Sequence, residues 1–319
     1  MFSRENVEKV AADYAVVGAL LALMLGFSLW LPDLFPSISN LQTILGDQAI
    51  PGILALAVVL PLAAGEFDLS VASTLGFVSV FSAYAASHGM AVGLILVLAI
   101  LIGILIGSVN ATLVRIGVNA FVATLGVSTV LVGANLLVTG GNVISEGIEE
   151  SYTSIAQNEI SGLILPVFYF LAITVLIWYL LEHTPYGRQV RATGLGREAA
   201  RLTGIRTSAI LSSTFVVAAV LAALAGFLQT ARVGSAPPDI GPDFLLPAYA
   251  AAFLGTTTVK RGRFNVWGTV IGVYLLAVGI NGLSLAGAPI WVPSVFNGCA
   301  LIVAVTLAVI VDRRKKSVA

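Results

Sequence analysis

Long apolar stretches without a charged residue recur along the whole chain, and each is close to the ~20 residues that a helix needs to cross a bilayer. Apolar residues make up 58% of the 319 residues, charged residues make up 10%, and the mean hydropathy is +1.00. A soluble domain of this composition would have too little polar surface to cover itself. The sequence therefore predicts an all-α polytopic membrane protein.

The charge-free stretches predict about ten transmembrane helices, two of them short or broken. We expect these helices at residues 14–31, 48–64, 71–87, 91–114, 118–139, 162–181, 209–231, 244–259, 264–285 and 290–311. A polar leader precedes the first stretch and no small-x-small cleavage site ends it, so we expect it to be retained as the first span. Ten spans place both termini on the same side.

The distribution of charge predicts which side that is. Of the sixteen lysines and arginines, all but Arg232 fall in segments on one side of this arrangement. The other side carries the acidic residues Asp33, Asp47, Glu146, Glu149, Glu150, Glu159, Asp239 and Asp243. Because cytoplasmic loops carry an excess of Lys and Arg, we expect both termini in the cytoplasm, where the basic tail can meet anionic lipid.

Two of the expected spans are weak. The second contains Pro51 and Pro61, and the eighth is shorter, contains Pro247 and follows the irregular stretch 232–242. Backbone that is broken at membrane depth needs protein or water to satisfy its amides, and short, Pro-interrupted spans in matching places of two halves indicate a transport pathway. The halves would be spans 1–5 and 6–10. Ordinary tilted or kinked helices are the alternative.

Glu66 and Asp68 are the only acidic residues between residues 48 and 114. An ionisable residue inside a membrane is costly, so it indicates function by default. The simpler interpretation, which we favour, is that Asp68 or Ser70 caps the helix that follows, where the helix dipole favours a carboxylate. Such a cap would still lie beside a pathway if the preceding helix is broken. Neither acidic residue has a basic partner nearby in the sequence.

Several kinds of site are absent from the sequence. There is no G-x-x-x-x-G-K-[ST] loop for ATP, no His/Cys/Asp cluster with metal spacing and no nucleophile elbow. Cys299 is the single cysteine, so no disulfide framework is available. We therefore expect no enzymatic activity, no metal, no nucleic-acid partner and no cofactor held by the chain itself.

Three pairs of glycines show the small-x-x-x-small spacing that lets helices approach closely. They are Gly89 and Gly93, Gly103 and Gly107, and Gly268 and Gly272. The chain has 32 glycines, so some of these pairs arise by chance. We expect tight helix packing at these positions, with a dimer face as one use of it.

The loop at 183–209 is the most unusual polar segment of the chain. It holds five arginines and a helix-like core, 197–202, between Gly196 and Gly204. An ion-coupled carrier needs no such docking element and usually shows ionisable residues along its helices. A permease driven by a separate ATPase does need a rigid cytoplasmic helix, because this helix must fit the ATPase and follow its movement. A solvated connector is the alternative.

The string GLGREAARLTGI at 194–205 resembles the coupling-loop signature of bacterial ABC importer permeases, in the version of ribose-type sugar permeases. Further blocks resemble segments of the same family. They are GEFDLSVAS at 65–73, NAFVATLG at 119–126, TARVGSAP at 230–237, GTTTVKRGR at 255–263, GTVIG at 268–272 and NGL at 281–283. The resemblance runs in order from about residue 50 to residue 314.

This resemblance implies a single permease domain over 1–319, with its coupling loop at 183–209, in the bacterial inner membrane. Two permease copies, identical or paralogous, would assemble with ABC-type ATPase subunits that bind ATP and Mg²⁺, and with a soluble sugar-binding protein outside. Segments 140–160 and 232–243 would meet that binding protein. The implied coupling residues are Arg197, Glu198, Ala199, Ala200, Arg201 and Gly204. The pathway candidates are Glu66, Asp68, Ser70 and Asn281.

The sequence departs from the family pattern at three places. Glu66 and Ala72 each replace a glycine, and Asn119-Ala120 replaces a proline pair. Glu66 adds a carboxylate near the expected pathway, so the substrate is expected to be a monosaccharide or related polyol and not ribose in particular. The alternative functions are an ion-coupled carrier or channel that acts without an ATPase, and a structural scaffold.

Overall fold

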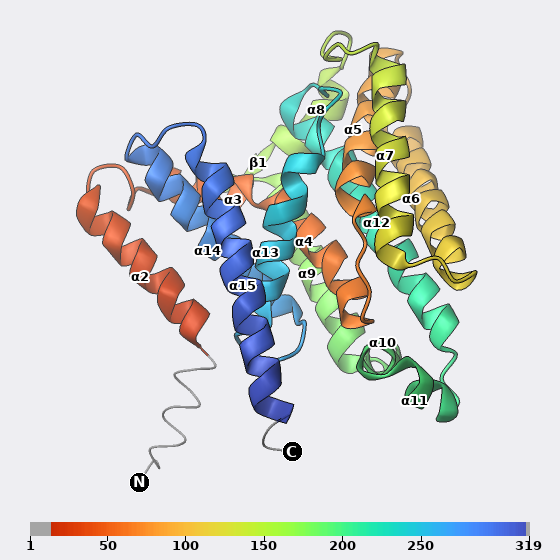
Figure 1. Cartoon of the computed structure of the whole chain (residues 1–319). Helices are drawn as coiled ribbons and strands as arrows, with labels where there is room; N and C mark the ends of the chain where they lie inside the picture. Colours follow the sequence, from red (N-terminus) through yellow and green to blue (C-terminus); the bar gives the residue numbers. More distant parts are fainter. Residues whose placement is uncertain (1–13, 317–319) are drawn as a thin grey trace. The chain divides into compact units, whose positions relative to one another are not determined.

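The chain folds into two compact units. The computed structural model describes residues 14–316, with side chains up to residue 309. One unit comprises residues up to 55 and from 246 onward, and the other comprises residues 56–245 (Figure 1). The predicted positions of Arg4, Lys9 and the basic tail 313–316 fall outside the described side chains and stay predictions.

Helices build the 56–245 unit. They are the second part of α4 (Ala49–Ala63), α5 (Ser70–Ser87), α6 (Val92–Arg115), α7 (Ala120–Thr139), α8 (Glu150–Gln157), α9 (Leu165–His183), α10 (Pro185–Leu195), α11 (Arg197–Leu202), α12 (Thr207–Val233) and the short η1 (Pro242–Phe244). A small antiparallel hairpin joins α8 to α9. Its strands are β1 (Glu159–Ile160) and β2 (Leu163–Ile164), and its turn residues Ser161 and Gly162 both have positive φ.

Helix α5 lies at the centre of this unit, with α6, α7 and α12 packed around it. Glycines on α6 allow α12 to come close, because a Cβ on Gly107 would lie 2.6 Å from the Cα of Val216. The predicted tight packing is therefore confirmed for Gly103 and Gly107. Gly89 and Gly93 make no such contact within this chain, because an added Cβ would meet nothing within 4 Å. A dimer face at this pair stays a prediction.

The other unit contains α2 (Ala15–Trp30), α3 (Ile38–Asp47), the first part of α4, α13 (Leu245–Gly255), α14 (Val266–Leu285) and α15 (Val292–Lys316). Its hydrophobic core brings Phe27 and Phe35 against residues of α14. The third glycine pair also packs as predicted, because a Cβ on Gly272 would lie 2.5 Å from the carbonyl oxygen of Ala251.

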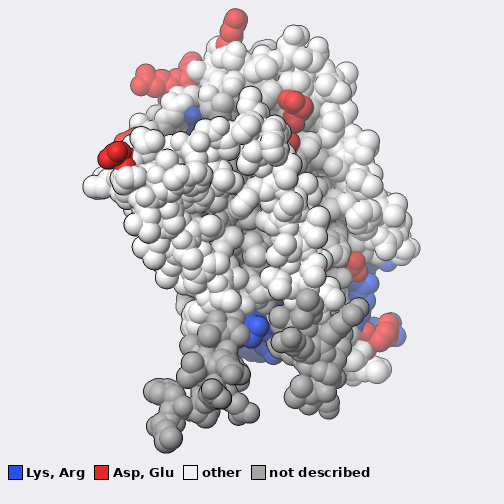
Figure 2. Space-filling model, turned by 60° about the vertical axis from the view of Figure 1, so that its left-hand side comes forward, with Lys and Arg blue, Asp and Glu red and all other residues white. Residues whose placement is uncertain are grey.

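The helical, polytopic class predicted from the sequence is confirmed. The described part of the chain contains eight helical segments long and apolar enough to cross a membrane, with α3 and α4 together forming one of them. Figure 2 shows that side chains other than Lys, Arg, Asp and Glu cover most of the face in view, as contact with lipid requires. The hairpin and the helices α3, α8 and α10 were not predicted. The total of ten spans stays a prediction.

The structure confirms that one of the two weak spans is short. Helix α13 has 11 residues, roughly 16 Å at 1.5 Å per residue, which is about half of the ~30 Å hydrocarbon core. Helix α4 has 15 residues and carries Pro61 inside its last turn, but together with α3 it forms an apolar segment of 26 residues. The chain crosses between the compact units within α4 and at the start of α13, so the compact units do not follow the suggested division into spans 1–5 and 6–10.

Candidate functional site

Helix α11 forms over the residues that the sequence predicted. Gly196 is its N-cap residue, and Gly204 ends it in a left-handed turn with φ +87°. In that turn the N–H of Ile205 bonds to the carbonyl oxygen of Ala200 at 3.2 Å. A side chain at Gly204 would be strained, because non-glycine residues rarely adopt this backbone conformation. The glycine thus fixes where the short helix stops.

Most of helix α11 is exposed. Only Ala200 of this helix is buried, whereas Leu202 at its end is 85% exposed and Leu195, just before the helix, is 88% exposed. Glu198 and Arg201 are also exposed and form an ion pair at 3.5 Å. Two largely exposed leucines therefore lie on the surface at this end of the unit, with charges between them.

The chain just before α11 touches the end of α4 backbone to backbone. A Cβ on Gly194 would lie 2.3 Å from the carbonyl oxygen of Ala63, and a Cβ on Gly65 would lie 3.3 Å from the Cα of Gly194. Gly65 has φ +86° and turns the chain out of α4. Glycine is needed on both sides of this contact, because any side chain would push the two segments apart.

An ion pair lies beside this backbone contact. Nη2 of Arg197, the first residue of α11, donates to Oε1 of Glu66 at 2.5 Å. The structure thus joins a coupling candidate to a pathway candidate, although no pattern in the sequence paired them. The two side chains are 44% and 25% exposed.

Beyond Glu66, a chain of buried hydrogen bonds leads into the unit. Asp68 is fully buried, and its Oδ1 accepts from the backbone N–H and the hydroxyl of Ser70 at 2.9 and 2.6 Å. Nδ2 of Asn110 on α6 donates to the same Ser70 hydroxyl at 2.7 Å. The N–H of Leu69 donates to Oγ1 of Thr124 on α7 at 3.0 Å. Asp68 is therefore bonded to the first residue of α5. The N-cap residue is Leu69, whose side chain makes no cap, and not Asp68 or Ser70 as predicted.

Hydroxyl pairs continue along α5. Ser73 bonds to Ser128 of α7 at 2.5 Å, and Ser79 bonds to Thr230 of α12 at 2.7 Å. Sequence reasoning missed these residues together with Asn110 and Thr124. The available signal was the run of serines and threonines inside an apolar helix, since buried hydroxyls must find partners.

At the other end of this unit, the two segments predicted to meet a binding protein lie together. Ile144 and Ala236 exchange backbone hydrogen bonds at 3.1 and 2.9 Å. The hydroxyl of Tyr152 on α8 donates to the carbonyl oxygen of Phe227 at 2.7 Å, and burial raises the pKa of this tyrosine. The segment 140–160 also carries exposed glutamates, which are Glu146, Glu149, Glu150 and Glu159.

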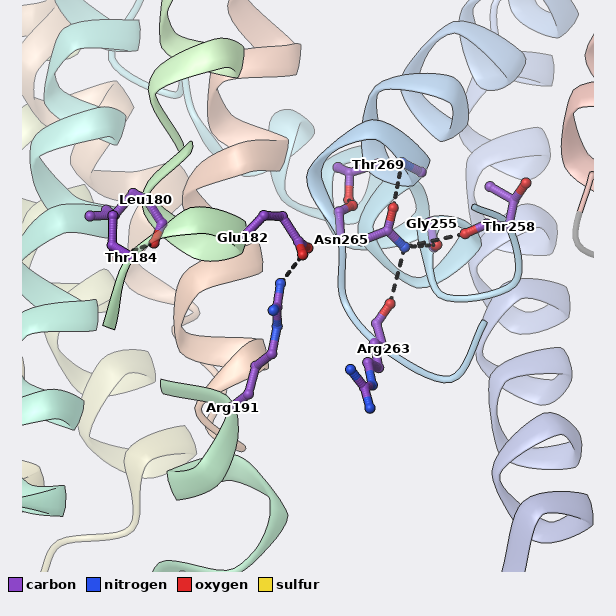
Figure 3. Close-up of polar contacts among 10 residues, drawn as sticks. Leu180, Glu182, Thr184, Arg191, Gly255, Thr258, Arg263, Asn265 and Thr269 are labelled. Carbon is purple, nitrogen blue, oxygen red and sulfur yellow. Dashed lines mark hydrogen bonds and ion pairs between the residues drawn. The ribbon is translucent and has the colours of Figure 1, made fainter. Parts of the chain in front are cut away.

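Asn281, the remaining pathway candidate, belongs to the other unit, on α14. Its Oδ1 is buried and has no hydrogen-bond partner among the described residues. The polar cluster of that unit centres instead on Asn265, whose Nδ2 donates to the carbonyl oxygens of Gly255 and Thr258 and whose Oδ1 accepts from the N–H of Gly268 (Figure 3). This cluster fixes the turn between α13 and α14.

A multi-pass helical protein with an exposed short helix at one end of the 56–245 unit, buried polar contacts along α5 and exposed carboxylates at the other end has the architecture of a membrane permease. Comparison with known families agrees. The sequence model of one protein family, described as the branched-chain amino acid transport system / permease component, matches residues 40–305. The chain belongs to this family.

Individual relatives confirm the resemblance to ribose-type importer permeases. The chain is 31% identical over 291 residues to the ribose import permease protein of Haemophilus influenzae, covering 90% of each chain. It is 32% identical over 302 residues to that of Escherichia coli K12, covering 93% of this chain and 92% of the relative. It is 32% identical over 296 residues to the autoinducer 2 import system permease protein of Klebsiella pneumoniae, covering 90% and 89%. No solved structure matches the chain.

Proposed function

We propose that the chain is the transmembrane permease subunit of an ATP-driven importer that moves a monosaccharide or related polyol into the cytoplasm. A separate ABC-type ATPase binds ATP and Mg²⁺, and a soluble sugar-binding protein delivers the substrate from outside. The permease acts as a pair, either with a second copy or with a paralogue. Relatives named as ribose import permeases support the sugar class, and the autoinducer 2 relative keeps that class broader than ribose.

We place the chain in the bacterial inner membrane with ten spans and both termini in the cytoplasm. In the 56–245 unit, α10 and α11 lie at one end and α8 at the other (Figure 1). The first end carries the arginines of the loop, and the second carries the exposed glutamates. An excess of Arg and Lys marks the cytoplasmic side, so this polarity supports the proposed orientation.

The observation that carries the proposal is α11 itself. Leu202 at the end of this helix and Leu195 just before it are exposed. On the other side, Arg197 and Gly194 contact the segment that leads into the central helix α5. A ligand or partner shifts a conformational equilibrium only through contacts that differ between the states. This helix provides such a contact: it presents its outer face to the ATPase, and its inner face is joined to the transport unit.

The docking role of α11 is tested with Leu202→Asp and Glu198→Arg in the complex with ATPase and binding protein. Each variant is expected to lower ATP-driven substrate uptake at least about ten-fold, the scale of losing an interface anchor. Gly204→Pro should do the same, because proline cannot adopt φ +87°. Insertion and the unfolding temperature should be unchanged for the first two, and Leu202→Met should keep uptake. Normal uptake by both charged variants in an intact complex would contradict the docking role.

The runner-up function is an ion-coupled carrier or channel that works alone. Its supporting observation is the buried carboxylate of Asp68 with its polar neighbours Ser70 and Asn110. A carrier that works alone has no partner to cover Leu195 and Leu202, so this alternative does not explain their exposure. Substrate flux by the purified chain in vesicles, driven by an ion gradient without ATPase, would favour this alternative.

A further inference from the structure

The structure supplies an ion-pair partner for Glu66, which the sequence alone left without one. The pair with Arg197 joins residues 131 positions apart. Both residues lie in the 56–245 unit. The pair bridges two segments with different expected roles, the docking helix α11 and the segment that leads from α4 into α5.

The two segments meet at two adjacent points. One is the close approach of Gly194 to the backbone carbonyl oxygen of Ala63, which is rigid because no flexible side chain lies between the two segments there. The other is the ion pair one residue beyond Gly65. The first contact transmits a push of α10 and α11 toward the segment. Only the second, an attraction, transmits a pull in the opposite direction.

The segment passes such a displacement on within four residues. Asp68 holds the N–H and the hydroxyl of Ser70, so a shift of residues 66–68 moves the first turn of α5. Leu69 and Ser70 are in turn bonded to α7 and α6. Three helices of the transport unit are therefore tied to the residues that immediately follow Glu66.

Neighbouring charges do not substitute for this pair. Arg201 is engaged with Glu198 at 3.5 Å within α11, and Arg191 is engaged with Glu182, which connects α10 to α9 (Figure 3). Among the ion pairs of the described residues, the one between Arg197 and Glu66 alone links α11 to the segment before α5.

We propose that the Glu66–Arg197 ion pair is a latch, which makes the start of α5 follow α11 when the ATPase withdraws it. This inference rests on the proposed function. A partly exposed ion pair changes an equilibrium by at most about five-fold, so the latch adds little to stability. It biases the conformational equilibrium, and its loss uncouples ATP hydrolysis from transport without unfolding the protein.

The test uses the full complex of permease, ATPase and binding protein in proteoliposomes, with substrate transported per ATP hydrolysed as the readout. Glu66→Gln and Arg197→Gln are each expected to lower this ratio two- to five-fold, the range that a partly exposed pair allows. The swapped double variant Glu66→Arg with Arg197→Glu is expected to restore at least half of the loss. Arg115→Gln removes an exposed arginine from the end of α6 and should leave the ratio unchanged.

Rescue by the swap separates a latch from a merely structural role, since a structural defect would not depend on the sign of the two charges. A swapped variant no better than either single variant would overturn the latch, and so would single variants with the wild-type ratio. Failure of the proposed function looks different. The wild-type complex itself would then show no ATP-dependent uptake.

Discussion

At the scale of single residues, the glycines of the site matter through the side chains that they lack. Gly194 and Gly65 allow two backbone segments to touch, and Gly204 allows the turn that ends α11. The same residue type is not needed everywhere. At Gly196 the backbone is extended, with φ 176°, and an added Cβ would lie 3.7 Å from the Cβ of Ala199.

Gly194→Ala should therefore destabilise the chain, because its Cβ would lie 2.3 Å from a backbone oxygen that cannot rotate away. We expect a loss of about 1–3 kcal/mol in the free energy of unfolding, as for an overpacked core. Gly196→Ala, two residues along, is the matched control and should unfold like the wild type. Thermal unfolding in detergent measures both. Equal unfolding temperatures for the two variants would contradict the close contact.

The structural role of a residue could be predicted from the sequence only where its neighbours in the chain form a recognisable pattern. The helix at 197–202 and its flanking glycines were visible locally. The partnership of Glu66 with Arg197 was not visible, because no spacing rule connects residues in different helices. Asn110 and Thr124 were missed for the same reason, since their partners Ser70 and Leu69 lie far from them in the sequence.

At the scale of elements, hydropathy placed the long helices well because lipid demands long apolar segments with internal hydrogen bonds. It missed α3, α8 and α10, which are amphipathic or polar and owe their stability to tertiary contacts. Helix α8 shows this clearly. Tyr152 bonds to the carbonyl oxygen of Phe227, and Nε2 of Gln157 bonds to that of Arg232 at 3.0 Å.

Tyr152→Phe tests that anchoring. Losing the hydroxyl should lower the free energy of unfolding by about 1 kcal/mol, the net value of one hydrogen bond. Burial raises the pKa of Tyr152 above its ordinary value, so the protonated form is favoured in the folded state. The contribution should thus be constant from about pH 6 to 9 and fall only as the pH rises beyond about 10. The control is Tyr84→Phe, at an exposed tyrosine of α5, which should leave the free energy of unfolding unchanged. If the effect of Tyr152→Phe disappeared below pH 9, the hydrogen bond from Tyr152 would not anchor α8.

At the scale of the whole molecule, the chain consists of two compact units, and it passes between them within α4 and at the start of α13. The sequence marked both segments as weak spans through their prolines and short length. It did not show that they separate compact units, because such a division depends on contacts between distant parts of the chain. The predicted helical, polytopic class and the permease family are confirmed.

The most direct test of the proposed function is substrate uptake by proteoliposomes that contain this chain with its ATPase and binding protein. A panel of pentoses, hexoses and polyols supplies the substrates, and ATP or an ion gradient is supplied separately. We expect uptake of at least one of these sugars only when ATP and Mg²⁺ are inside with the ATPase and the binding protein is outside. Uptake driven by an ion gradient in vesicles that lack the ATPase would contradict the account.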